Sequence, residues 1–142
     1  MIEAAVIDAS VGVKWVVDET DADLARSLSA YRLQAPDLFP IECANILWKK
    51  VQIHELTRRN ALDCLDLLRR GPIAIVPTRE LLADALQLGM ALHYPVYDCV
   101  YLTLALREGV PLVTADRRLA AAARGFRKTK GADILLSEIP RL

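Results

Sequence analysis

Four acidic residues interrupt otherwise apolar segments of this chain, and their type and spacing suit a shared chemical site. Asp8 follows the apolar run "AAVI" and Asp116 follows "PLVTA", so each stands where a strand should end. Glu42 lies within "FPIECANIL" and Asp98 within "YPVYDCVYLTLAL". A lone carboxylate buried among such residues would cost several kcal/mol or lose its charge. Each of these acids therefore needs a cation, hydrogen-bond donors or water.

Stabilisation of helix starts is a simpler explanation for the same acids. Asp8, Asp98 and Asp116 each stand where a side-chain oxygen can accept hydrogen bonds from the first N–H groups of a helix. Glu42 falls in the first turn of a helix, where a negative charge complements the helix dipole. The two explanations differ in one respect, because only a shared site requires the four carboxylates to lie together.

The elements that position these acids alternate between strand and helix. Strand patterns cover residues 3–9, 34–36, 73–76, 111–115 and 133–137, and we expect "IAIV" at 73–76 to be buried. Helical patterns cover residues 10–19, 20–33, 38–55, 57–70, 78–93, 98–108 and 116–123. The alternation predicts an α/β/α sandwich, in which helices flank a mostly parallel central sheet of four to five strands. In the third helix, Ile41, Ala44, Trp48 and Val51 share one face.

Such a sheet would bring the four acids to one edge. The carboxyl ends of parallel strands share an edge, and ligands bind there. Carboxylates about 5 Å apart repel by roughly 3 kcal/mol per pair at an effective dielectric constant near 20. A divalent cation offsets that repulsion, and an all-oxygen pocket suits Mg²⁺ or Mn²⁺ better than zinc. The sequence therefore predicts a metal site.

The ordered set "VIDAS", "YDCVYLTLA" and "LVTAD", with Glu42 on a helix between the first two, resembles the PIN-domain ribonucleases. The similarity is greatest to the VapC-type toxins of toxin–antitoxin pairs and runs nearly end to end, so we expect one PIN-like domain over residues 1–142. The resemblance implies that Asp8, Glu42, Asp98 and Asp116 are catalytic and hold one or two Mg²⁺ or Mn²⁺ ions. It also implies hydrolysis of RNA phosphodiester bonds by metal-activated water, with tRNA or rRNA as the substrate.

Several polar residues beside the acids match supporting positions of that family. Ser10 and Thr114 match hydroxyl positions beside the first and last acids, where they would orient a carboxylate, contact substrate or cap a helix. Asn45 lies one turn after Glu42, where a polar side chain can hold a water molecule. Ala120 stands where some family members carry a further acid, so the ligands of a second ion stay open.

Positive charge for RNA binding has candidates close to the last acid. Arg117 and Arg118 follow Asp116 directly, and the run "RGFRKTKG" adds Arg124, Arg127, Lys128 and Lys130. A run of this kind is also typical of a solvated loop. The chain has no formal net charge, so a local patch rather than overall charge would have to meet the RNA.

The bulk composition bears on partners and location. A hydrophobic fraction of 54% exceeds the usual range and suits an apolar surface kept for a partner. The resemblance implies a cognate antitoxin and a homodimer, with Trp15, Leu28 and Tyr31 as candidates for the antitoxin groove. Three cysteines without a CxxC pair indicate buried thiols of a reduced, cytoplasmic protein, and no apolar run is long enough for a membrane span.

Two other functions fit the same residues. One is a Mg²⁺-dependent phosphohydrolase with Asp8 as the nucleophile, although Ser10 occupies the place of the second Asp that such enzymes often carry. The other is a catalytically inert module that binds metal or a partner. Release of phosphate from a monoester would support the first, and stabilisation by metal without RNA cleavage would support the second.

Overall fold

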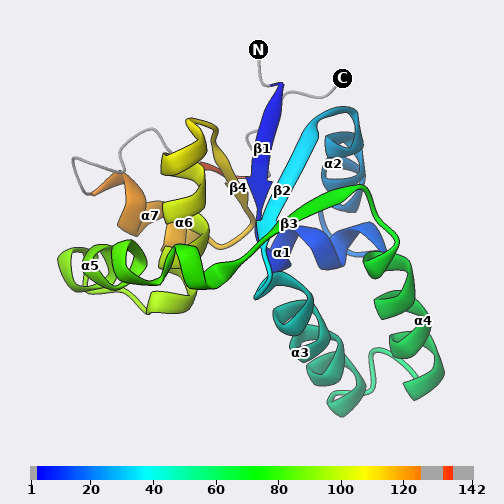
Figure 1. Ribbon diagram of the computed structural model, residues 1–142. Helices are drawn as coiled ribbons and strands as arrows, with labels where there is room; N and C mark the ends of the chain where they lie inside the picture. The colour runs from blue at the N-terminus through cyan, green and yellow to red at the C-terminus, as the bar shows by residue number, and fades with distance from the viewer. Residues whose placement is uncertain (1–2, 126–132, 136–142) are drawn as a thin grey trace.

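A sheet of five parallel strands lies at the centre of the computed structural model, which describes residues 3–125 and 133–135 (Figure 1). The strands lie in the order β3-β2-β1-β4-β5, and all four neighbouring pairs are parallel. They are β1 (Ala4–Ile7), β2 (Arg32–Pro36), β3 (Ile73–Val76), β4 (Leu112–Thr114) and β5 (Asp133–Leu135). The prediction of a mostly parallel sheet of four to five strands is confirmed.

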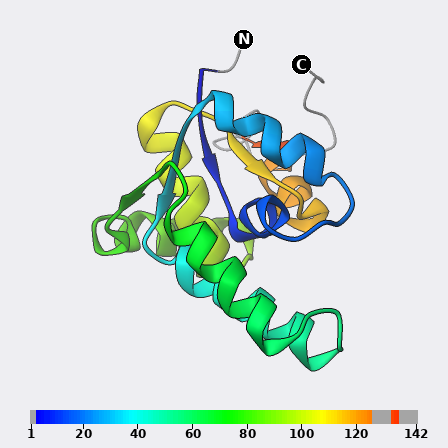
Figure 2. The same cartoon turned by 90° about the vertical axis from the view of Figure 1, so that its right-hand side faces the viewer.

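Helices cover both faces of this sheet. Those that follow β1 and β2 are α1 (Ala9–Gly12), α2 (Ala22–Ser27), α3 (Phe39–Gln52) and α4 (Arg58–Arg69), with short 3₁₀ turns η1 (Val13–Trp15) and η2 (Leu28–Ala30). Those that follow β3 and β4 are η3 (Thr78–Glu80), α5 (Leu82–Leu92), α6 (Val96–Glu108) and α7 (Arg117–Arg124). The two sets lie on opposite sides of the sheet, because right-handed crossovers place them there when the strand order reverses (Figures 1 and 2). None of the described helices is long and apolar enough to span a membrane.

The strand order reverses between β1 and β4, and this reversal defines the functional edge of the sheet. The chain steps outward from β1 to β2 and β3, then returns to add β4 and β5 on the other side of β1. In open α/β sheets, ligands bind at the carboxyl ends of the strands at such a reversal. Asp8 directly follows β1, and Asp116 lies two residues beyond β4.

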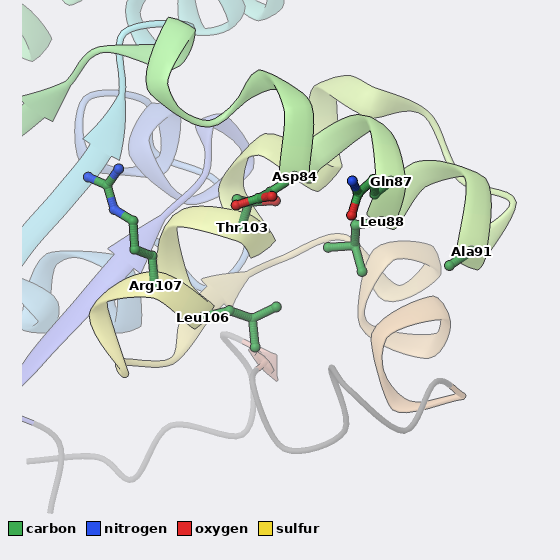
Figure 3. A pocket seen from close by; sticks show the side chains of 7 residues that line it. All are labelled: Asp84, Gln87, Leu88, Ala91, Thr103, Leu106 and Arg107. Carbon is green, nitrogen blue, oxygen red and sulfur yellow. The ribbon is translucent and has the colours of Figure 1, made fainter.

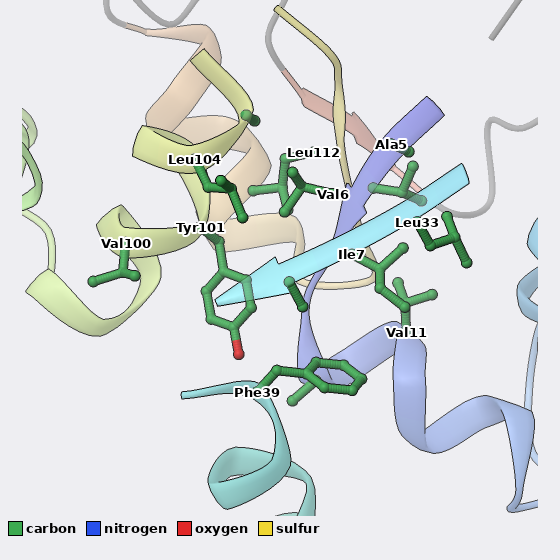
Figure 4. Packing of buried hydrophobic residues seen from close by; sticks show 14 of the residues in the cluster. Ala5, Val6, Ile7, Val11, Leu33, Phe39, Val100, Tyr101, Leu104 and Leu112 are labelled. Carbon is green, nitrogen blue, oxygen red and sulfur yellow. The ribbon is translucent and has the colours of Figure 1, made fainter. Parts of the chain in front are cut away.

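The core forms around β1, β4 and α6 (Figure 4). The last three residues of β1 and the first two of β4 are fully buried, and the middle of α6 from Cys99 to Ala105 is buried as well. A helix that is apolar all round is one that is buried all round. This central position explains why the segment around Asp98 reads as a continuous apolar run.

Several boundaries and exposures differ from the predictions. β3 is an edge strand that pairs only with β2, and Ile75 is 46% exposed, so the expectation of a buried strand is wrong. β2 begins at Arg32, inside the range expected to be helical, because α2 ends at Ser27. The predicted strand at 133–137 is β5 at 133–135, and residues 136–137 lie outside the described ones.

The apolar stripe on α3 faces away from the core. Ile41 is 67% exposed and Trp48 is 56% exposed, whereas Phe39, Cys43 and Leu47 face inward. Both faces of this helix carry apolar residues, so periodicity alone does not reveal which one packs against the sheet. The face that packs is the one that meets α1, where Phe39 lies against Gly12.

Candidate active site

Asp8 is held rigidly at the end of β1. The side chain is 5% exposed, and its Oδ1 accepts hydrogen bonds from the Val11 N–H at 3.3 Å and from the Ser10 hydroxyl at 2.5 Å. Its Oδ2 accepts a hydrogen bond from the Thr114 hydroxyl at 2.5 Å. Asp8 is thus the N-cap of α1, as the capping explanation expects, and both its oxygens are also oriented by neighbouring hydroxyls.

Ser10 and Thr114 connect Asp8 to the segment that follows β4. The Ser10 Oγ accepts a hydrogen bond from the Ala115 N–H, and the Thr114 Oγ1 accepts one from the Asp116 N–H, each at 3.0 Å. Each hydroxyl has one proton, and that proton goes to Asp8. Both hydroxyls therefore orient a carboxylate, and neither has a proton left to donate to a ligand.

Two of the four acids are helix caps and two are not. Asp116 caps α7, since its Oδ1 accepts hydrogen bonds from the Arg118 N–H at 2.9 Å and the Leu119 N–H at 3.3 Å. α6 begins after Pro95 without a side-chain cap, so Asp98 lies inside the helix and the capping explanation fails for it. Glu42 lies in the first turn of α3 and does not cap it.

Three of the four carboxyls have raised pKa values, and the causes of these shifts relate the acids to one another. Burial, followed by the charges of Glu42, Asp8 and Asp116, raises the pKa of Asp98 to about 7. Burial also raises the pKa of Asp8 despite its three hydrogen bonds, and raises that of Glu42. Because the charge of Asp8 also raises the pKa of Glu42, four segments of the chain bring their acids to one place.

No positive side chain neutralises this cluster among the residues that the structure describes. The ion pairs found between described residues all lie elsewhere, and none includes one of the four acids. Oε1 of Glu42 is buried without a hydrogen-bond partner. Oδ2 of Asp116 accepts no hydrogen bond from any described residue. The cluster therefore holds negative charge and open oxygen lone pairs.

These features fit a divalent cation that prefers oxygen ligands. As the side chains stand in the described part of the chain, no three His, Cys, Asp or Glu residues are arranged to hold a metal ion. The donor set is nevertheless all carboxylate, which is the chemistry that Mg²⁺ and Mn²⁺ favour. A cation would give the buried Glu42 oxygen a partner. It would also relieve the repulsion among the four carboxylates, which no positive side chain among the described residues offsets.

Two tyrosines belong to this site, and the sequence analysis missed both. The Tyr101 ring is fully buried, and its hydroxyl lacks a hydrogen-bond partner among the described residues. Burial, followed by the charges of Asp116 and Asp98, raises the pKa of Tyr94 to about 12. Tyr101 lies three residues after Asp98 on α6, which is one helical turn, whereas Tyr94 precedes the helix. The spacing of Tyr101 indicates proximity to Asp98, but it does not distinguish a residue of the site from a residue of the core.

The remaining candidate residues lie at the surface. Asn45, Arg117 and Arg118 are exposed, and no described hydrogen bond joins the Asn45 side chain to an acid. Arg117 and Arg118 form the first residues of α7, directly after Asp116. Arg124, at the end of α7, is also exposed. Arg127, Lys128 and Lys130 lie outside the described residues.

Cavities that suit other ligands open away from the acids. One of about 400 Å³ lies between α5 and α6, with Asp84 and Gln87 on one wall and Thr103 and Arg107 on the other (Figure 3). Another, of about 510 Å³, lies between α3 and α4 and is lined by apolar residues such as Trp48 and Leu62. None of the four acids lines either cavity.

Comparison with known proteins finds a matching family profile and a similar relative. The family profile described as "PIN domain" matches residues 5–125. Over 119 aligned residues the chain is 34% identical to Ribonuclease VapC3 of Pyrobaculum aerophilum. The aligned region covers 81% of this chain and 91% of the relative.

Solved structures share the fold. PAE2754 from Pyrobaculum aerophilum is similar with a TM-score of 0.72 and 24% identity, over 96% of this chain and 85% of that one. A chain of a toxin–antitoxin complex from Klebsiella pneumoniae is similar with a TM-score of 0.64 and 14% identity, over 95% of this chain and 99% of that one. At such identities the likeness shows the fold alone.

Proposed function

The chain belongs to the PIN-domain family, and we propose that it is a metal-dependent endoribonuclease that acts as the toxin of a toxin–antitoxin pair. The observation that carries the proposal is the cluster of four carboxylates without a counter-charge at the reversal of the strand order. The name of the relative, Ribonuclease VapC3, supports RNA as the substrate, which we propose to be a tRNA or an rRNA. The toxin–antitoxin complex with the same fold supports an antitoxin partner.

In this proposal Asp8, Glu42, Asp98 and Asp116 hold one or two Mg²⁺ or Mn²⁺ ions. A bound ion of this kind lowers the pKa of an attacking water and stabilises the charge that develops on the phosphoryl oxygens. Ser10 and Thr114 hold the Asp8 carboxylate in one orientation, so little rearrangement of that side chain opposes binding. Asp98 is partly protonated near neutral pH without a cation, and loses that proton when its carboxylate becomes a ligand.

Substrate binding falls to exposed residues around the acids. Arg117 and Arg118 offer positive charge beside Asp116 for contacts to RNA phosphates, which position a strand without reading its sequence. Asn45 is exposed one turn along α3 from Glu42, where we propose that it contacts substrate or a water molecule. Neutralisation of either arginine should weaken RNA binding and reduce its salt dependence.

We propose that the antitoxin binds the apolar cavity between α3 and α4, where Trp48 and Leu62 are exposed. The earlier candidates for this groove were Trp15, Leu28 and Tyr31. Leu28 is fully buried, whereas Trp15 and Tyr31 are half-buried and pack against the core, and the Trp15 indole N–H donates a hydrogen bond to the Ala25 carbonyl. We further propose a homodimer, and a cytoplasmic location in keeping with three free, buried cysteines.

The alternative of a phosphohydrolase is less favoured by the geometry. Enzymes of that kind often carry a second Asp two residues after the nucleophile, but Ser10 occupies this place and donates its hydroxyl proton to Asp8. An inert module would retain the acids for structure alone. Two of the acids serve as caps, and Glu42 and Asp98 lie in first turns where a negative charge complements the helix dipole, but none of these uses requires the four acids to lie together.

The experiment that tests the proposal is cleavage of total cellular RNA in Mn²⁺, with new 5′-phosphate ends mapped by sequencing. Wild-type protein should produce discrete ends that disappear with EDTA and in D8N. The matched control is D63N, because Asp63 is an exposed acid on α4 outside the cluster and should leave cleavage intact. Ends that persist in EDTA would refute metal dependence, and stabilisation by Mn²⁺ without any cleavage would favour the inert module.

A further inference from the structure

Two buried oxygen atoms at the acid cluster lack hydrogen-bond partners, and they are complementary as acceptor and donor. Glu42 Oε1 is an acceptor without a donor, and the Tyr101 hydroxyl is a donor without an acceptor. A buried polar group left unpaired costs free energy and calls for an explanation. Four buried side chains of the described residues have such an atom, and these two belong to the same site.

The Tyr101 hydroxyl lies next to Glu42. Tyr101 is on α6, one turn after Asp98, and its ring points from that helix toward the start of α3 (Figure 4). Glu42 lies in the first turn of α3, and the Tyr101 hydroxyl is near enough to lower the pKa of its carboxyl, against the larger effect of burial. Burial, then the charge of Glu42, raises the pKa of Tyr101 above its usual range. A tyrosine hydroxyl carries its proton at neutral pH and an ionised carboxylate only accepts hydrogen bonds, so Tyr101 can act toward Glu42 only as a donor.

We propose that Tyr101 is a positioning residue that holds the Glu42 carboxylate for metal binding, by donating a hydrogen bond to Oε1. This inference rests on the proposed metal-dependent function. With Oε1 held by the hydroxyl, the other oxygen of Glu42 is directed to the cation. Asp98, which lies on the same helix as Tyr101, is the neighbouring ligand. Removal of a group that hydrogen-bonds to a metal ligand, without contacting the metal itself, weakens metal affinity about 10- to 100-fold.

A purely structural role for Tyr101 makes the opposite prediction. If the ring serves only to fill the core, its unpaired hydroxyl is a cost, and Y101F should keep or raise the stability of the metal-free protein without changing metal affinity. Y101F removes one oxygen and keeps the ring, so the core packing around it is retained.

The test is Mn²⁺ binding to the full chain by isothermal titration calorimetry. Y101F should weaken binding about 10-fold or more. In an E42Q background the same change should have no further effect on Mn²⁺ affinity, because the carboxylate ligand that Tyr101 orients is absent. The matched control is T103V: Thr103 is on the same helix and also has a buried, unpaired hydroxyl, but it faces the α5–α6 cavity away from the acids. T103V should bind Mn²⁺ as the wild type does.

Each other outcome has a definite meaning. Wild-type affinity in Y101F, or an equal loss in T103V, overturns the inference and leaves the proposed function standing. A wild type that binds no Mn²⁺ overturns both. A second measurement needs no variant: in protein with ¹³C-labelled tyrosine rings, Mg²⁺ should shift the signal of the fully buried Tyr101, which a soluble relaxation agent does not reach. No shift of that protected signal also overturns the inference.

Discussion

Thr114 joins β1 to the start of α7 through a single hydroxyl. Its Oγ1 donates to Asp8 and accepts from the Asp116 N–H in a fully buried position. T114V keeps the shape but leaves that N–H and one oxygen of Asp8 unpaired, so we expect the free energy of unfolding to fall by about 1–3 kcal/mol. T114S retains the hydroxyl and should lose much less. Urea unfolding of both variants tests this, and equal stability of the two would show that the hydroxyl does not join these segments.

Asp98 makes the stability of the metal-free protein depend on pH. Its pKa of about 7 in the folded chain lies above the ordinary value of 3.8, so the folded chain binds an extra proton between these values. The contribution of this protonated carboxyl to the stability of the folded chain is complete below about pH 4 and is lost as the pH rises to about 7. Burial raises the pKa values of Asp8 and Glu42 in the same direction. The informative quantity is therefore the difference between wild type and D98N.

We expect that difference to appear in urea unfolding with EDTA over pH 4 to 8. The free energy of unfolding of the wild type, relative to D98N, should decrease as the pH rises through this range and level off above about 7. Saturating Mg²⁺ should reverse the trend, because the ligand form of Asp98 is the charged one. A difference that rises with pH in EDTA would mean that the Asp98 carboxylate is stabilised in its charged form.

The individual acids could be predicted from the sequence, and their supporting tyrosines could not. A charged residue such as Asp98 in an otherwise apolar helix is unusual, and this predicts that it has a function. Tyr101 in the same helix is what a buried core contains by default, so nothing in its type marks it. Its proposed role depends on which way a single hydroxyl points, and that follows from the packing of α6 against the sheet.

At the scale of elements, the strands and helices could be predicted better than their exposed faces. Short apolar strands flanked by turns were recognised, yet the position of β3 at the edge follows from the strand order, which no local pattern encodes. On α3 the inward face follows from contact with α1, since Phe39 and Gly12 meet there. Residues far apart in the chain decide both cases, so periodicity of one segment is insufficient.

The contact between α1 and α3 sets the position of Glu42 relative to Asp8. A Cβ added to Gly12 would lie 2.4 Å from Cζ of Phe39, which is far inside van der Waals contact. We therefore expect G12A to destabilise the fold by about 1–3 kcal/mol through overpacking. G125A is the matched control, because its added Cβ would meet only Ala121 O at 3.5 Å and Ala122 O at 3.7 Å. Thermal unfolding of both checks this, and equal melting temperatures would show that Phe39 moves away freely.

At the scale of the whole molecule, the excess apolar residues divide between two separate surfaces. One comprises α3 and α4, where Ile41, Trp48 and Leu62 are exposed. The other comprises α5 and α6, where exposed apolar residues recur at four-residue spacing: Leu82, Leu86 and Met90. Contiguous apolar patches on a small protein mark interaction sites. Two such surfaces on different sides of the sheet suit two different partners (Figure 1).

We assign the α5–α6 surface to the proposed homodimer. A two-fold axis pairs a surface with itself, so that surface must be self-complementary. The stripe of Leu82, Leu86 and Met90 lies on the face of α5 turned away from the residues that line the α5–α6 cavity, so it is open to the same stripe of a second copy. We expect L86E to convert the dimer to a monomer, measured by sedimentation equilibrium. L62E, on the other surface and similarly exposed, should remain dimeric. If L62E dissociates and L86E does not, the dimer forms through α3 and α4, and the antitoxin would then need another site.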